Sequence, residues 1–322
     1  MNLDRRGWLH TKGTVRRSSL LRLIALALSW GSSFLWIKLG LRSFSPAWIV
    51  AIRLALGAAV LTVVLRATKQ RLPSGRDVWL HLGVAALFAN VVPFALFAYG
   101  ERQVDSAIAG MLNATTPLWT ILVATAVGQE RRPSPGKLAG IVVGFVGTLV
   151  IFSPWRHTSD VMSWGGLACL AAAACYGFTF VYMKHFLAGR GLSPLRLAAG
   201  QLSAATVLAA AALPLLGAGT SAIRPEALVA VGVLGAMGTG LAYLINYRLI
   251  TDEGASATSL VTYLLPIVAV ALGAAVLGEV IPLNALAGTV IVLAGVALAR
   301  HSVRRTTQRR ISTSADAVGF PS

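Results

Sequence analysis

Charged residues are scarce in this chain of 322 residues, since Asp, Glu, Lys and Arg together make up 12% of it. Soluble domains usually carry about 25% charged residues. Hydrophobic residues reach 56%, and long apolar runs recur along the whole length. One aqueous core cannot bury that much apolar surface, so the composition excludes an ordinary soluble domain and indicates a protein that resides in lipid.

Residues and motifs of disulfide frameworks, metal sites and enzymes are also scarce. Both cysteines, Cys169 and Cys175, lie inside one apolar run, where we expect small packing residues rather than a bridge. The five histidines are scattered without the spacing of metal ligands, and no Gly-x-Ser-x-Gly, His-Glu-x-x-His or Walker sequence occurs. The sequence therefore predicts no catalytic residue, no metal and no cofactor, and we expect a protein that is not an enzyme.

Apolar runs, in contrast, are abundant, and each approaches the roughly 20 residues that cross a bilayer as a helix. Helices are expected because backbone polar groups within lipid need partners inside the same segment. The ten predicted helices cover residues 20–41, 46–65, 78–99, 107–127, 136–152, 163–183, 194–216, 225–249, 255–277 and 283–299.

Basic residues give the chain a net charge of +17, and their positions predict how it crosses the membrane. With a cytoplasmic amino terminus, 22 of the 28 Lys and Arg residues fall on the cytoplasmic side and 5 on the outer side. This asymmetry follows the positive-inside rule and predicts that both termini are cytoplasmic. The basic residues are spread over every inner loop rather than gathered on one face, so we expect no nucleic-acid partner.

One segment of the chain occurs twice, because residues 99–147 match residues 247–295 at an offset of 148 or 149. Such a fixed offset indicates an internal duplication. Each half holds five predicted helices, and this odd number makes the second half enter the membrane from the opposite side. The matched residues include Tyr99 and Tyr247, Pro117 and Pro266, Glu130 and Glu279, and Gly147 and Gly295.

The predicted fold class is an all-α integral membrane protein with ten transmembrane helices, arranged as two inverted-topology five-helix repeats. The predicted parts are a basic cytoplasmic segment (1–19), the first repeat (20–152), an outer linker (153–162), the second repeat (163–299) and a basic cytoplasmic tail (300–322). We expect the tail to be disordered, because it is basic and rich in Ser and Thr.

Short sequences in both halves also carry a resemblance to a known family. They are Trp30-Gly-Ser-Ser-Phe34, Ser45-Pro46 and Gly-Gln-Glu130 in the first half, and Val-Thr-Tyr-Leu-Leu-Pro266 and Leu-Gly-Glu279 in the second. With them, residues 20–299 resemble the EamA-type family of the drug/metabolite transporter (DMT) superfamily. The resemblance implies a ten-helix secondary carrier of the cytoplasmic membrane for small metabolites such as amino acids, sugars, nucleobases or drugs. It further implies a central cavity surrounded by helices 1, 3, 4, 6, 8 and 9, and it names no substrate.

Polar residues on the fourth predicted helix form the first candidate site, since polar groups within a bilayer are costly and functional by default. Asn113, Thr116, Pro117 and Thr120 share one helix face. Pro117 has no N–H group, so the carbonyl near Asn113 is expected to lack its helical partner. Either this carbonyl and its polar neighbours bind a solute, or the neighbours satisfy the carbonyl themselves.

Related groups occur on five further helices. Ser259, Thr262, Tyr263 and Pro266 mirror the first group on the ninth helix, and Asn90 with Pro93 weakens the third helix opposite the glycines around Thr239 in the eighth. Aromatic residues of the first, sixth and eighth helices are expected as cavity walls or gates, with an interfacial belt or helix packing as the alternative. The predicted solute-contacting residues are Trp30, Ser33, Asn90, Asn113, Thr116, Tyr176, Tyr243, Thr262 and Tyr263, and the predicted helix breaks or hinges are Pro93, Pro117, Gly240 and Pro266.

Few charged residues are candidates. Arg53 is the one cation placed well inside the membrane, about a third of the way along the second predicted helix, where it either neutralises a solute carboxylate or pairs with a carbonyl. Glu130 and Glu279 lie at helix ends near prolines, which favours loop-orienting or capping roles over proton transfer.

Glycines repeat every fourth residue in the fifth predicted helix, at Gly136, Gly140 and Gly144. Such a row permits the close approach of another helix. Packing within the chain is the favoured interpretation, and a homodimer is the alternative.

The sequence as a whole predicts a secondary carrier that moves a small metabolite or drug-like solute, with export favoured, by alternating access. Its expected partners are the solute and the lipid bilayer, and a proton is a candidate coupling ion. The alternative is a non-transporting membrane scaffold or a membrane enzyme.

Overall fold

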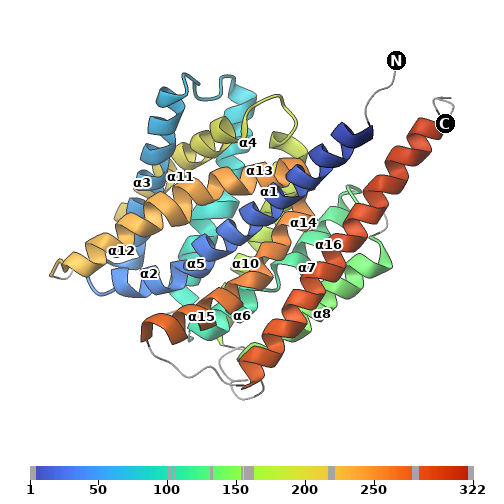
Figure 1. Ribbon diagram of the computed structural model, residues 1–322. Helices are drawn as coiled ribbons and strands as arrows, with labels where there is room; N and C mark the ends of the chain where they lie inside the picture. Colours follow the sequence, from blue (N-terminus) through green and yellow to red (C-terminus); the bar gives the residue numbers. More distant parts are fainter. Residues whose placement is uncertain are drawn as a thin grey trace. The chain divides into compact units, whose positions relative to one another are not determined.

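The computed structural model describes residues 5–100, 103–104, 106–130, 133–153, 155, 163–216, 222–277 and 283–317. Helices account for all regular elements in these ranges, which contain no strand (Figure 1). The all-α prediction is therefore confirmed for the described part of the chain.

Many of these helices are suited to lipid. In the described ranges six helices are long and apolar enough to cross a membrane, namely Ser18–Ile37, Pro46–Ala67, Arg76–Gly100, Trp164–Leu187, Pro194–Pro214 and Pro225–Glu253. Three shorter apolar helices cover Pro135–Ile151, Ala255–Val268 and Leu283–Ala299. The chain is thus an integral membrane protein, as its composition predicts.

The chain forms two compact units. Unit 1 comprises Met1–Leu87 and Lys184–Gly254, and unit 2 comprises Phe88–Met183 and Ala255–Ser322. Each unit combines segments from both sequence halves, so the compact units differ from the two sequence repeats.

Unit 1 contains seven α-helices and one π-helix whose bounds matter below. They are α1 (Arg5–Gly31), α2 (Ser33–Gly40), α3 (Pro46–Ala67), α4 (Arg76–Ala86), α11 (Pro194–Leu216), α12 (Pro225–Gly235), the π-helix η4 (Ala236–Leu241) and α13 (Ala242–Glu253).

Helix α3 begins at Pro46, whose fixed φ suits a first helical turn, and the Ser45 hydroxyl oxygen accepts a hydrogen bond from the Trp48 N–H (3.4 Å). It then packs closely on η4, since a Cβ on Gly57 would lie 3.1 Å from the Gly240 nitrogen. This close approach brings Arg53 of α3 to the π-helix.

The described part of unit 2 contains eight α-helices and a 3₁₀ segment. They are α5 (Val92–Gly100), α6 (Ser106–Asn113), α7 (Thr116–Ala126), α8 (Pro135–Phe152), α10 (Trp164–Tyr182), α14 (Ala255–Ser259), the 3₁₀ helix η5 (Leu260–Leu264), α15 (Leu265–Leu277) and α16 (Leu283–Ala317). Two π-helices, η1 (Leu87–Val91) and η3 (Met183–Leu187), each include residues of both units.

Helices α8 and α16 lie side by side in unit 2 and cross through their glycines (Figure 1). A Cβ on Gly288 would lie 2.6 Å from the Gly147 carbonyl oxygen, and a Cβ on Gly295 would lie 2.3 Å from the Gly144 nitrogen. The later residue of one helix thus meets the earlier residue of the other, which makes the pair antiparallel. The other glycines of the row also face atoms of this chain, so the row serves packing within it.

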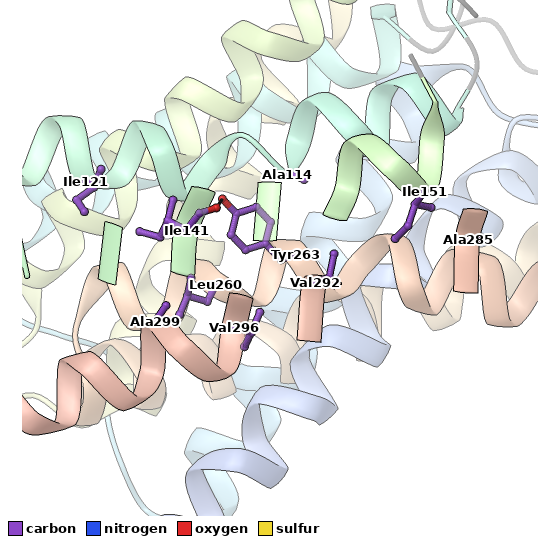
Figure 2. Packing of buried hydrophobic residues seen from close by; sticks show 10 residues of the cluster. All are labelled: Ala114, Ile121, Ile141, Ile151, Leu260, Tyr263, Ala285, Val292, Val296 and Ala299. Carbon is purple, nitrogen blue, oxygen red and sulfur yellow. Dashed lines mark hydrogen bonds between the residues drawn. The ribbon is translucent and has the colours of Figure 1, made fainter. Parts of the chain in front are cut away.

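Around this crossing lies the apolar core drawn in Figure 2, with the ring of Tyr263 among aliphatic side chains of α8 and α16. The cluster comprises Ala114, Ile121, Ile141, Ile151, Leu260, Tyr263, Ala285, Val292, Val296 and Ala299.

The last helix, α16, continues beyond its apolar part to Ala317. No proline or glycine follows Gly295 before the helix ends. Adding one residue to an existing helix gains a hydrogen bond without a new nucleus, which explains why the helix extends beyond its apolar part.

Candidate functional site

Two π-helices lie at equivalent places of the repeats, near the polar residues predicted from the sequence. Segment η1 contains Asn90, which is fully buried, and η4 contains Thr239 and Gly240. The Thr239 hydroxyl donates to the carbonyl oxygen of Leu234, five residues earlier, at 3.0 Å. Single π-helical turns inside α-helices are rare and are often found at functional sites.

Proline residues stand directly after three of the irregular segments. Pro93, Pro117 and Pro266 are each the second residue of a helix, in α5, α7 and α15. A proline is tolerated in a first helical turn because its missing N–H has no helical acceptor there. Each of the three prolines therefore lies in the first turn of the helix that follows an interruption.

The break before Pro117 shows how the carbonyl near Asn113 is satisfied. Helix α6 ends at Asn113, and the Thr116 hydroxyl donates to the Asn113 carbonyl oxygen at 2.7 Å. A neighbouring hydroxyl thus replaces the missing amide, which is the second of the two alternatives that the sequence leaves open. Both side chains are buried, with 6% of Asn113 and none of Thr116 exposed.

On the equivalent helix of the second repeat, hydroxyl groups are used in the same way. The Thr262 hydroxyl donates to the Ser259 carbonyl oxygen (2.8 Å), and the Ser259 hydroxyl donates to the Ser256 carbonyl oxygen (3.1 Å). These local bonds support the 3₁₀ segment η5. They also satisfy hydroxyls among three buried polar residues of unit 2, Ser256, Ser259 and Thr262.

Tyr263 lies in the core of unit 2. Its side chain is fully buried, its hydroxyl donates to the Ile141 carbonyl oxygen at 2.8 Å, and its ring faces Gly144 (Figure 2). A glycine at position 144 leaves room for that ring, since a Cβ would lie 2.9 Å from it. This environment indicates that Tyr263 joins α8 to the ninth-helix segment.

Tyr176 of α10 also belongs to unit 2, where it stacks on Phe97 of α5 with ring centroids 5.9 Å apart. Phe178, two residues later, meets the ring of Phe88 edge-on at 5.3 Å. The sixth and third helix segments thus contact through aromatic rings on both sides of α10.

Unit 1 brings together the predicted residues of the first and eighth helices. Trp30 of α1 meets Tyr243 of α13 edge-on, with ring centroids 6.1 Å apart. The Ser29 hydroxyl donates to the Met237 carbonyl oxygen (2.9 Å), and Ser33 lies so near Gly238 that a Cβ there would approach its hydroxyl to 3.2 Å. The predicted residues Trp30, Ser33 and Tyr243 therefore surround η4.

Arg53 is the buried cation of this group, with 6% of it exposed. Its Nε donates to the Thr239 hydroxyl oxygen at 3.1 Å, so a side chain of η4 is one of its partners. The sequence offered Arg53 but not Thr239, because only the packing of α3 on η4 brings the two together.

Two further polar residues of unit 1 were not predicted as sites. Asn246 is 3% exposed, and its Oδ1 has no hydrogen-bond partner among the described residues. Gln201, the repeat equivalent of Arg53, accepts a hydrogen bond from the Tyr247 hydroxyl, and both side chains are fully buried. Their signal in the sequence is their polarity within apolar runs.

The paired glutamates have unequal outcomes. Glu130 accepts hydrogen bonds from Lys137 of α8 and from the Ser256 hydroxyl of α14 (3.1 Å), in agreement with the loop-orienting interpretation. Glu279 lies outside the described residues.

Comparisons with known proteins agree with this architecture. Residues 17–153 and 163–300 each match the model of the EamA-like transporter family. The chain is 28% identical over 261 residues to the "Uncharacterized inner membrane transporter YedA" of Escherichia coli, covering 80% of this chain and 82% of that protein. It is 29% identical over 295 residues to the "Probable terminal-alkyne amino-acid exporter" of Streptantibioticus cattleyicolor, covering 91% and 95%.

A solved crystal structure shares the fold, with a TM-score of 0.73 and 21% identity over 90% of this chain and 99% of the other. The two family-model matches together cover most of the chain. The protein is therefore a membrane transporter that belongs to the EamA-like transporter family of the drug/metabolite transporter superfamily.

Proposed function

We propose that the protein is a secondary carrier that exports a small metabolite or drug-like solute across the cytoplasmic membrane by alternating access. One observation carries the proposal: helices are interrupted at equivalent positions of the two repeats. The π-helices η1 and η4 form one pair, and the breaks before Pro117 and Pro266 form the other. Discontinuous helices in corresponding places of two halves are typical of transport sites.

The proposed topology has ten membrane helices in two inverted repeats, 20–152 and 163–299, with cytoplasmic termini. The glycine crossing supports it, because Gly147 meets Gly288 while its repeat equivalent Gly295 meets Gly140 and Gly144. Two equivalent helices that contact each other in this reciprocal and antiparallel manner are related by a local two-fold axis. An inverted repeat has such an axis in the membrane plane.

In unit 1 we propose that Trp30, Ser33 and Tyr243 contact the solute. Their support is the edge-on ring pair next to η4, where a flat or apolar solute finds aromatic surface and a hydroxyl. Gly240, which lies against Gly57, permits η4 and α3 to remain in contact there.

In unit 2 we propose solute contacts for Asn90, Asn113 and Tyr176. The two asparagines lie next to irregular backbone, and Tyr176 belongs to an aromatic stack. For Thr116, Thr262 and Tyr263 we propose supporting roles instead, because their hydroxyls already bind backbone carbonyls.

The proposed solutes are small and resemble amino acids in the first instance, since one relative is named as an amino-acid exporter. A proton is retained as a candidate coupling ion.

Transport by purified protein in liposomes tests the proposal, with a panel of labelled amino acids, sugars, nucleobases and cationic dyes. We expect Trp30→Ala and Tyr243→Ala to lower the initial rate at least about tenfold, since an aromatic contact contributes on the order of 1 kcal/mol and its loss enlarges the site. Trp164→Ala is the matched control, because Trp164 is 78% exposed at the start of α10. Equal rates in all three variants would show that Trp30 and Tyr243 do not contact the solute. A folded protein that moves no solute of the panel would contradict the carrier function.

A further inference from the structure

The chain passes between unit 1 and unit 2 at three places, and the backbone is irregular at each. The first passage, Leu87 to Phe88, lies in η1, and the second, Met183 to Lys184, lies in η3. The third follows Gly254, whose φ of 89° suits glycine alone. Changes of backbone direction in domain movements are absorbed by a few residues at such element ends. We call these three places joints.

Two of the joints are held, from within unit 2, by one short turn that follows α7. The Gln129 side-chain amide donates to the Val181 carbonyl oxygen (3.2 Å), two residues before the η3 joint. The Glu130 carboxylate accepts from the Ser256 hydroxyl (3.1 Å), two residues after Gly254.

The turn itself is fixed to both neighbouring helices. The backbone N–H of Glu130 donates to the Ala124 carbonyl oxygen (3.0 Å), which ties it to α7. Lys137 of α8 donates to both carboxylate oxygens, and only 7% of the lysine side chain and 26% of the glutamate side chain are exposed. Hydrogen bonds to a carboxylate are stronger than neutral ones, and a half-buried ion pair resists separation.

We call the turn with Gln129 and Glu130, fixed by Lys137, the clamp. The sequence of the second repeat lacks two of its three side chains. At the repeat offset, Gly278 replaces Gln129 and Ala285 replaces Lys137. Neither side chain can hydrogen-bond, although Glu279 corresponds to Glu130. By sequence, the Gln and Lys side chains of the clamp therefore occur in the first repeat alone, at the end that the basic residues predict to be cytoplasmic.

We propose that Gln129 and Glu130 are positioning residues that hold the unit 2 ends of the η3 and Gly254 joints, so that bending is confined to the joints. Because the second repeat lacks the Gln129 and Lys137 side chains, bending at the joints costs different free energies in the two half-cycles of transport. This consequence for transport depends on the proposed function, whereas the clamp itself does not.

Hydrogen exchange of the full-length protein in nanodiscs tests the clamp without any solute. Gln129→Ala should speed amide exchange about fivefold or more in residues 181–187 and leave 255–259 unchanged, because a neutral hydrogen bond is lost. Ser256→Ala should show the reverse pattern, at about tenfold, since its bond is to a charged acceptor. The Glu130–Lys137 pair remains in both variants.

Ser203→Ala is the matched control, since the Ser203 hydroxyl binds only a carbonyl of its own helix, α11 (2.8 Å). A merely structural role would raise exchange throughout unit 2 in both variants, or at neither joint, and either result would overturn the proposal. If the exchange pattern is as expected but no solute is transported, the clamp stands and the carrier function fails.

Discussion

Replacing Gly295 with alanine should lower the stability of unit 2 measurably, because α8 leaves no room for a side chain at that position. The added Cβ would lie 2.3 Å from the Gly144 nitrogen, 2.7 Å from the Gly144 Cα and 2.7 Å from the Gly140 carbonyl oxygen. All three are backbone atoms, so the helices must separate. Overpacking of this kind costs roughly 1–3 kcal/mol, while the better helix propensity of alanine returns up to about 1 kcal/mol. We expect a net loss of about 2 kcal/mol at the upper end of these effects.

The apparent melting temperature in detergent, followed by fluorescence-detected size exclusion, measures this loss. A net loss of this size should lower it by several degrees, roughly 4–8 °C. Gly232→Ala in α12 is the matched control, since a Cβ there meets no atom within 4 Å and should leave the melting temperature equal or higher. The reciprocal crossing predicts a similar loss for Gly147→Ala, the repeat equivalent, whose Cβ would lie 2.6 Å from the Val292 nitrogen. A Gly295→Ala protein as stable as the wild type would refute the helix crossing described above.

Three further variants test individual residues. Tyr263→Phe should lower stability by about 1 kcal/mol while transport persists, because only the bond to the Ile141 carbonyl is lost, and a melting curve beside a transport assay checks both. Thr116→Val should lower the melting temperature by a few degrees, because the buried Asn113 carbonyl then has neither the Thr116 hydroxyl nor an amide as hydrogen-bond donor. Unchanged stability would show that the Thr116 hydroxyl does not support the break before Pro117. Arg53→Met should speed hydrogen exchange in η4 about fivefold or more, since the donor to its hydroxyl side chain is lost, and unchanged exchange would show that the contact does not support the π-helix.

Much of the local structure follows from features that the sequence states directly. Proline lacks an N–H and is favoured in a first helical turn, and Pro117 and Pro266 do lie directly after irregular backbone, as the second residues of α7 and α15. Glycines four residues apart admit a second helix, and the row in α8 does meet α16. These effects depend on residues close together in the chain, which is why they can be predicted.

Contacts between side chains far apart in the chain do not follow from the sequence in this way. The sequence predicts that Arg53 needs a polar partner, but only the packing of α3 on η4 selects Thr239. Tyr263 has the same appearance in the sequence as a solute-binding aromatic, and only its contact with Gly144 and Ile141 identifies it as a core residue. The division into compact units that mix both repeats is likewise a property of tertiary packing.

Buried hydroxyl groups in these membrane helices bind the backbone of the chain itself. The hydroxyls of Thr116, Thr120 and Thr262 all donate to carbonyls three or four residues earlier in the chain. Such bonds satisfy the side chain and the irregular backbone together. Polarity alone therefore predicts where a helix is interrupted more reliably than which atoms meet a solute.

Counterflow in proteoliposomes tests the central claim, a carrier that works by alternating access, most directly. Liposomes holding the purified protein are preloaded with an unlabelled solute from the panel, and uptake of the labelled form is then followed. A carrier returns faster with solute bound, so we predict transient accumulation of label that requires preloading and saturates with concentration. Folded protein that gives no uptake above protein-free liposomes with any solute, or uptake that is indifferent to preloading, would contradict the account.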